Sequence, residues 1–129
     1  MKNKFAIVLS LGALACAMRL SAAAPFSRSA AEFVKDIALG INIGNTLDCS
    51  SGNETEWGNR QVTRSLLRLY KSKGINAVRL PVTWRRQFSV DDPKHEIRRA
   101  FLDRVQEVVD MCIAEGFVTI LNIQHDGGS

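Results

Sequence analysis

The fold is decided by the sequence KGINAVRLP at residues 73–81. Gly74 is suited to end a helix, because it lacks a Cβ and tolerates the left-handed backbone found there. A short apolar run, Ala77 to Leu80, follows, and Pro81 is expected to end it as a strand. A helix that stops at a glycine and leads through a short link into an apolar strand is typical of α/β proteins.

The same pattern is found upstream of this stretch. Residues 37–43 form an apolar run that predicts a strand, and residues 45–59 are rich in Gly, Ser, Asn and Thr and predict a long loop. Asn59 can cap the helix that follows. One face of that helix is apolar at helical spacing, with the residues Val62, Leu66, Leu69 and Tyr70.

The pattern continues downstream. Residues 85–94 predict another loop, Gly116 ends a second helix, and residues 118–123 predict a third strand. A further short helix is predicted at residues 30–35. The apolar face of the second helix consists of Phe101, Val105, Val108 and Cys112.

The order strand, helix, strand, helix, strand indicates parallel strands with covering helices. Long strand-to-helix loops and short return links favour a (β/α) barrel, in which such loops build the active face. The rival, a doubly wound sheet, usually carries a glycine-rich phosphate turn, and no G-x-G-x-x-G or P-loop is present. A full barrel takes about 250 residues. The sequence therefore predicts the first three βα units of a (β/α)₈ TIM barrel, incomplete in this chain; a complete small three-strand domain is the alternative.

Composition excludes several classes of protein. The 129 residues correspond to one domain or less, and the 46% hydrophobic and 23% charged residues are ordinary for a globular chain. Most of the net charge of +4 resides in the first residues: Lys2, Lys4 and Arg19 precede any acidic residue, and the rest of the chain has 14 basic against 13 acidic residues, a balance of +1. Without a clustered basic face, no nucleic-acid partner is expected.

Residues 1–23 are interpreted as a signal peptide. Lys2 and Lys4 precede an apolar stretch, Phe5 to Met18, and small residues follow, with cleavage expected after Ala23. Residues 24–36 then form a polar lead-in. Two alternatives stay open, a short membrane anchor and lipid attachment at Cys16, whose context Ala13-Leu14-Ala15 loosely resembles a bacterial lipoprotein box. The signal peptide and both alternatives predict a secreted or cell-surface protein.

Export brings the chain into an oxidising setting, where disulfides form. After loss of Cys16, Cys49 and Cys112 remain and can pair, although a buried free thiol is the favoured state of Cys112 on its apolar helix face. Three cysteines in all are too few and wrongly spaced for a zinc motif.

Polar and aromatic side chains gather where each predicted strand meets its following loop. Trp57 stands in a polar loop, where an exposed indole suits stacking on a sugar ring or a base. Glu54 and Glu56 are expected to be solvated, since nothing nearby would split their pKa values for acid/base work. His125 and Asp126 offer two ligands to a metal ion, although a zinc site needs at least a third. The other candidates are Asn45, Asp48, Arg79, Trp84 and Gln124.

Five sequence blocks occur in a characteristic order along the chain. They are GINIGNTLD at 40–48, ETEWGN at 54–59, VRLPVTW at 78–84, LDRVQEVVD at 102–110 and ILNIQHDG at 120–127. Together they resemble the N-terminal third of glycoside hydrolase family 5, the endoglucanase or cellulase group. The resemblance assigns residues 37–129 to the N-terminal part of the catalytic barrel. It does not define the substrate, because the family also includes mannanases, xyloglucanases and xylanases.

The resemblance implies a secreted endo-β-1,4-glucanase that acts on β-glucan. Such an enzyme hydrolyses the β-glycosidic bonds of a plant polysaccharide and retains the configuration at the anomeric carbon. In such enzymes two carboxylates lie roughly 5–5.5 Å apart, one as acid/base and one as nucleophile. Both glutamates would lie beyond Ser129, so no catalytic acid or nucleophile is expected in this chain. No cofactor or metal is expected either, and the 129 residues alone should be inactive.

The resemblance also implies the supporting residues. Arg79 matches the family arginine at the end of strand two, whose charge would orient the nucleophile and keep it ionised. Asn45 matches the strand-one asparagine near the sugar subsites, and His125 matches the second histidine of a His-His pair that hydrogen-bonds sugar hydroxyls. Trp57 lies in a loop that flanks the cleft in relatives. Gln124 stands where the family has the first histidine of a His-His pair. Glutamine can still hydrogen-bond a sugar hydroxyl, but it cannot become a cation.

Departures from the family pattern keep two other functions open. Gln124 leaves room for a weakened enzyme or a non-catalytic carbohydrate-binding relative. Arg60 replaces a common proline at the first turn of a helix, which costs only some rigidity. The third hypothesis is a different secreted barrel hydrolase with a metal at His125 and Asp126.

Overall fold

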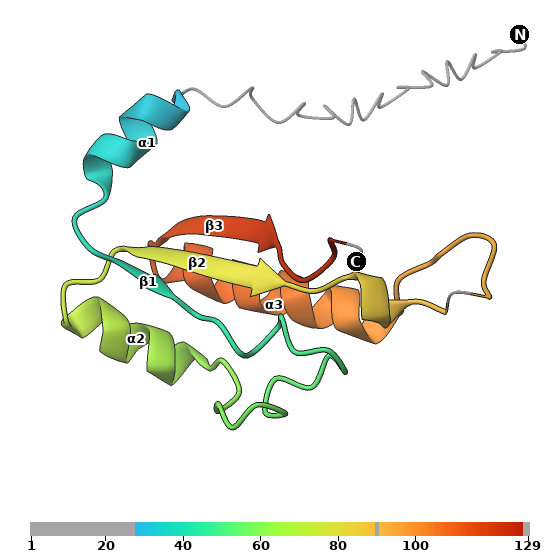
Figure 1. Cartoon of the computed structure of the whole chain (residues 1–129). Helices are drawn as coiled ribbons and strands as arrows, with labels where there is room; N and C mark the ends of the chain where they lie inside the picture. The colour runs from blue at the N-terminus through green and yellow to red at the C-terminus, as the bar shows by residue number, and fades with distance from the viewer. Residues whose placement is uncertain (1–27, 90, 128–129) are drawn as a thin grey trace, which may run out of the picture.

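The computed structural model describes residues 28–89 and 91–127. The expected signal peptide and Cys16 lie outside these residues, as does the start of the lead-in. None of the helices in the described part of the chain is long and apolar enough to cross a membrane. In chain order the elements are α1 (Ala30–Asp36), β1 (Gly40–Asn42), α2 (Arg64–Ser72), β2 (Ala77–Val82), the 3₁₀ helix η1 (Arg85–Gln87), α3 (Arg99–Ala114) and β3 (Val118–Ile123) (Figure 1).

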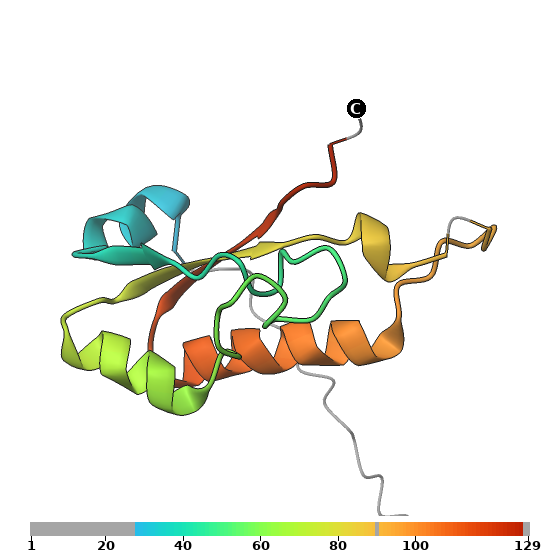
Figure 2. The same cartoon turned by 60° about the horizontal axis from the view of Figure 1, so that its bottom comes forward.

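The three strands form one parallel sheet in the order β1-β2-β3. Arg79 of β2 lies opposite Asn42 of β1 and Ile120 of β3, so the strands end at the same edge of the sheet. Helices α2 and α3 lie side by side on one face, and α1 lies on the other side, near the amino ends of the strands (Figures 1 and 2). The predicted order of strands and helices and the α/β class are confirmed.

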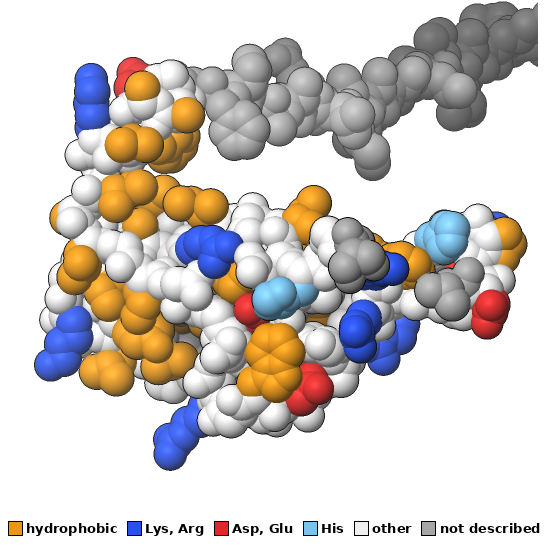
Figure 3. Space-filling model, viewed as in Figure 1, with side chains coloured by type: hydrophobic (Ala, Val, Ile, Leu, Met, Phe, Trp, Pro, Cys, Tyr) orange, Lys and Arg blue, Asp and Glu red, His pale blue; other side chains and the backbone are white. Residues whose placement is uncertain are grey.

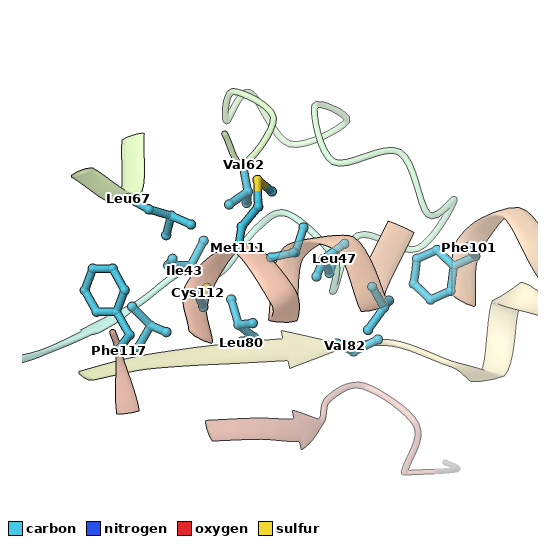
Figure 4. Packing of buried hydrophobic residues seen from close by; sticks show 13 residues of the cluster. Ile43, Leu47, Val62, Leu67, Leu80, Val82, Phe101, Met111, Cys112 and Phe117 are labelled. Carbon is cyan, nitrogen blue, oxygen red and sulfur yellow. The ribbon is translucent and has the colours of Figure 1, made fainter. Parts of the chain in front are cut away.

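The hydrophobic core lies between β2 and the two helices. Side chains from β2, α3 and the segments around α2 point toward one another there (Figure 4). Full burial of each such Val or Leu contributes about 1.5–3 kcal/mol. The buried cluster contains Ile43, Leu47, Val62, Leu67, Val78, Leu80, Val82, Phe101, Val105, Val108, Met111, Cys112 and Phe117.

The predicted apolar face of α3 is confirmed, but that of α2 is partly wrong. Leu67 is the buried residue of α2, whereas Leu69 is 53% exposed. The helix begins at Arg64, so Val62 is buried but precedes the helix, and Leu67 rather than Leu69 faces the core. Its N-cap is Thr63, whose hydroxyl accepts the Leu66 N–H at 3.3 Å.

Two further boundary predictions are corrected by the sheet. The first strand is shorter than predicted, and β2 continues through Pro81 to Val82. The Arg79 carbonyl accepts the Ile43 N–H at 2.9 Å, so Arg79 faces β1. Alternate residues of a strand face the same neighbour, so Pro81 also faces the β1 side, beyond the end of that strand. The missing N–H of Pro81 therefore costs no ladder hydrogen bond.

Two glycines end the helices as expected. Gly74 and Gly116 have φ values of 85° and 73°, the left-handed conformation that closes a helix.

Cys49 and Cys112 are both buried free thiols. Burial raises the pKa of the Cys112 thiol to about 11. Cys112 therefore acts as a packing residue of the core.

Candidate active site

Arg79 is the centre of a polar cluster at the carboxyl ends of the strands. Its Nη1 donates to Asn42 Oδ1 at 2.5 Å, and its Nη2 donates to Gln124 Oε1 at 2.9 Å. The guanidinium of β2 therefore links β1 to the residue that directly follows β3. Because arginine keeps its charge at any ordinary pH, the cluster presents a permanent cation in a defined orientation. Asn42 was missed by sequence reasoning; a single polar residue within an apolar strand was the available signal.

Gln124 is held by both its backbone and its side chain. Its N–H donates to the Val82 carbonyl at 2.8 Å, and its carbonyl accepts the Thr83 hydroxyl at 2.8 Å. Arg79 can only donate, so the amide oxygen of Gln124 must face it. The amide nitrogen is thereby left as a donor for another group. The single hydroxyl proton of Thr83 is shared with the Asp48 carbonyl, whose oxygen lies 2.9 Å from Oγ1, so Thr83 ties the first loop to the end of the third strand.

His125 and Trp57 come together from distant parts of the chain. Their rings meet edge to face, with centroids 5.9 Å apart and an interplanar angle of 78°. Trp57 is 42% exposed, and the His125 side chain is half exposed. His125 Nε2 lies 4.0 Å from Asp48 Oδ2, a buried carboxylate. The pair thus offers one apolar ring and one hydrogen-bonding ring on the same surface.

Asn45 lies on the first loop in a left-handed conformation, with a φ of 56°. Asn59 was expected to cap a helix, which is wrong. Its amide instead donates to the carbonyls of Gly44 at 2.9 Å and Asn45 at 3.3 Å. This contact joins the two ends of the loop that carries Trp57. The face in Figure 3 has histidine, basic, acidic and hydrophobic side chains close together near the tips of the strands.

The prediction that both loop glutamates are solvated is wrong for Glu54. Its side chain is 5% exposed and forms an ion pair with Arg104 of α3, with Nε 2.5 Å from Oε1. Glu56 is exposed, as predicted, and accepts the Ser51 N–H at 3.0 Å and the Ser51 hydroxyl at 2.8 Å. Both hydrogen bonds lower the pKa of the Glu56 carboxyl, and the one from the Ser51 N–H has the larger effect. The burial of Glu54 was hidden because its partner is on a distant helix.

Asp126 has a structural role in this arrangement. Its carboxylate accepts the backbone N–H groups of Trp84 at 3.0 Å and Arg85 at 2.8 Å, at the start of η1.

Across residues 28–89 and 91–127, no three His, Cys, Asp or Glu side chains are grouped so that they could hold a metal ion. A shallow pocket of about 270 Å³ lies away from Arg79, where residues 51–53 meet the start of α3.

Parallel β/α units with polar groups at the carboxyl ends of the strands are the arrangement found at the active face of (β/α) barrels. Comparison with known families makes this specific. The sequence model of the cellulase family, glycosyl hydrolase family 5, matches residues 42–129, and the chain belongs to this family.

Individual relatives agree with this assignment. The chain is 42% identical over 98 residues to the cellulase/esterase CelE of Acetivibrio thermocellus, a match that covers 76% of this chain and 12% of CelE. It is 36% identical over 110 residues to endoglucanase A of Clostridium longisporum, covering 78% of this chain and 21% of that protein. The chain therefore spans only a small part of the length of these relatives.

Solved structures confirm the fold. A broad-specificity endoglucanase from Clostridium acetobutylicum superposes with a TM-score of 0.70 at 40% identity, covering 77% of this chain and 29% of that one. A family 5 xyloglucanase from Paenibacillus pabuli, solved with a ligand, gives a TM-score of 0.69 at 36% identity, covering 75% of this chain and 28% of that one. The open three-stranded sheet thus matches one part of family 5 barrel structures.

Proposed function

We propose that the chain is the N-terminal part of a secreted endo-β-1,4-glucanase, here called the parent enzyme. The observation that carries the proposal is Arg79, held between Asn42 and Gln124 at the strand ends of a family 5 chain. A rigid cation at that place suits the orientation of a carboxylate nucleophile and keeps it ionised. Several similar proteins are named endoglucanases, which supports β-glucan as the substrate class.

In the proposed mechanism the reactive carboxylates come from the remainder of the barrel. One glutamate protonates the leaving oxygen, and a second attacks the anomeric carbon to form a covalent glycosyl-enzyme, which water then hydrolyses. Asn45, Gln124 and His125 hydrogen-bond sugar hydroxyls, and the exposed face of Trp57 packs on a sugar ring. Residues 1–23 direct export of the parent enzyme. This division leaves the 129 residues alone without the means of hydrolysis.

Gln124 supports a second candidate, a carbohydrate-binding relative without turnover. Its amide does not titrate, so it cannot supply a second cation beside the nucleophile. Sugar binding requires only the hydrogen bonds and the Trp57 ring, whereas hydrolysis also requires an ionised nucleophile.

The two candidates are separated with the parent enzyme expressed from its complete coding sequence. Carboxymethylcellulose, xyloglucan and mannan are tested as substrates, and the anomer first formed from a cello-oligosaccharide is followed by proton NMR. The proposal expects turnover with the β-anomer first, lost in Arg79→Ala and only partly recovered in Arg79→Lys, which keeps the charge but not the two-pronged geometry. Binding of cello-oligosaccharide with no hydrolysis of any substrate would establish the second candidate instead.

A further inference from the structure

Residues 54–62 form a closed loop that begins and ends at a single contact. The Glu54 carboxylate accepts the Val62 N–H at 2.9 Å. Arg104 of α3 donates to the Val62 carbonyl at 2.6 Å, so both backbone groups of Val62 are engaged. Loops whose ends meet in this way are compact and hold their own shape. The position of everything within the loop therefore depends on the contact at its base.

The base of the loop is a buried ion pair. Arg104 Nε and Nη2 lie 2.5 Å and 3.2 Å from the two carboxylate oxygens of Glu54, a two-pronged arrangement. The Glu54 side chain is 5% exposed and that of Arg104 19% exposed. The two parallel contacts fix the orientation of the two side chains. Because little water reaches these groups, removal of one partner would leave a buried charge without compensation. Hydrogen bonding to Glu54 also raises the pKa of Arg104 above its ordinary value.

Trp57 lies inside this closed loop, between two anchors. Glu54 fixes the loop on one side of it, and the Asn59 amide fixes the other side to the Gly44 and Asn45 carbonyls. The indole, 42% exposed, makes its aromatic contact with the His125 ring on a different element. An exposed ring gains little orientation from core packing. The backbone that carries it must therefore supply the orientation.

We propose that Glu54 and Arg104 are positioning residues that hold Trp57 against His125, as a preformed platform for one pyranose ring of a β-linked glucan. Neither residue touches the sugar; both act through the closed loop. This inference rests on the proposed function for the identity of the ligand. The ordering of Trp57 by the pair does not depend on it. Preorganisation of this kind improves binding by removing the cost of ordering the loop.

The test uses Glu54→Gln in the parent enzyme, which keeps the side-chain shape and removes the charge. The matched control is Glu107→Gln, because Glu107 is the other ion-pair partner of Arg104 and its side chain is 61% exposed. The first readout is the split between KM and kcat on cellohexaose. The second is the fluorine NMR resonance of 5-fluorotryptophan at position 57, identified by its absence in Trp57→Phe. Its solvent isotope shift measures how exposed the indole is.

The expected result for Glu54→Gln is a KM raised about 2- to 10-fold, the range for loss of one aromatic contact, with kcat nearly unchanged. The Trp57 resonance should also move toward the exposed value, while Glu107→Gln changes neither readout. An unchanged resonance and KM in Glu54→Gln would overturn the proposal. If the parent enzyme has no turnover, the proposed function fails, and the fluorine resonance alone still decides whether the pair orders Trp57.

A second variant covers the case in which Glu54→Gln does not fold. In Glu54→Leu with Arg104→Met, apolar side chains of similar length replace both charges, an exchange that buried pairs often tolerate. The double variant should stay folded and still release the Trp57 resonance toward the exposed value. A folded double variant with Trp57 in its original environment would contradict the role of the ion pair.

Discussion

Replacement of Gln124 by leucine tests how much the Arg79 cluster depends on its third-strand partner. Leucine has a similar size but cannot accept the Arg79 hydrogen bond, which spans 2.9 Å. A hydrogen bond to a charged group contributes about 1.5–3 kcal/mol, equivalent to about 10- to 150-fold in rate. Arg79 keeps its bond to Asn42, and the Gln124 contact is only part-buried. We therefore expect the lower end of that range, a loss of about 10-fold in kcat/KM.

The assay is kcat/KM of the parent enzyme on a soluble cello-oligosaccharide, with thermal unfolding measured in parallel. Gln106→Leu is the matched control, because Gln106 is exposed on α3 and donates to Asp110 at 2.7 Å, away from the cluster. The control should retain full activity. The reasoning is refuted if Gln124→Leu stays within twofold of the wild type, or if Gln106→Leu loses as much. If the unfolding temperature of Gln124→Leu falls while its kcat/KM is unchanged, Gln124 only stabilises the fold.

Variants at the Arg79 cluster, at the aromatic pair and in the core give three more tests. Gln124→His should introduce an acid limb in the pH profile of kcat/KM below about pH 6, because an imidazole with an ordinary pKa of about 6.5 becomes a cation beside Arg79; a profile that matches the wild type would contradict this. Trp57→Ala should raise KM about 2- to 10-fold with little change in kcat, measured on cellohexaose. Burial raises the pKa of Cys112 to about 11. The protonated thiol therefore contributes stability that is complete below the unfolded pKa of about 8.5 and is lost as the pH rises toward 11. The urea midpoint of the parent enzyme should fall over that window, and the fall should be smaller in Cys112→Ala.

The isolated 129 residues provide a simple check on the proposed division of labour. With both reactive glutamates expected elsewhere in the parent enzyme, the purified chain should not hydrolyse soluble β-glucan. It should also fail to melt cooperatively as a monomer, because β3 exposes Ile120, Leu121 and Ile123 at 46–69% in the described part of the chain. Hydrolysis that disappears in Arg79→Ala of the purified chain would contradict the first expectation, and a sharp monomeric transition in calorimetry would contradict the second.

Local sequence signals were sufficient for most of the fold. Glycines at 74 and 116 marked the helix ends, because few other residues tolerate the left-handed backbone there. The third strand, residues 118–123, was predicted with its observed bounds. The error at Pro81 arose because a missing N–H matters only where a neighbouring strand faces it, and the pattern along one strand does not contain that information.

For the candidate site as well, local sequence signals indicated the main residues but not the partners that hold them. Arg79, Gln124, His125 and Trp57 were predicted from residue type and from the resemblance, because their chemistry is visible in the sequence. The partners were not visible: Asn42 beside Arg79, and Arg104 beside Glu54. Those contacts join residues from separate elements.

The sequence by itself thus determined the parallel α/β architecture, the family and the polar residues at the strand ends, because periodicity, glycine stops and motif order are local properties of the chain. Only the tertiary structure decided that Glu54 is a buried anchor rather than a solvated carboxylate, and that Arg79 links Asn42 of β1 to Gln124 at the end of β3. Burial and partnership of a charged group depend on which distant elements pack against it. That arrangement follows from the register of the sheet and the docking of α3.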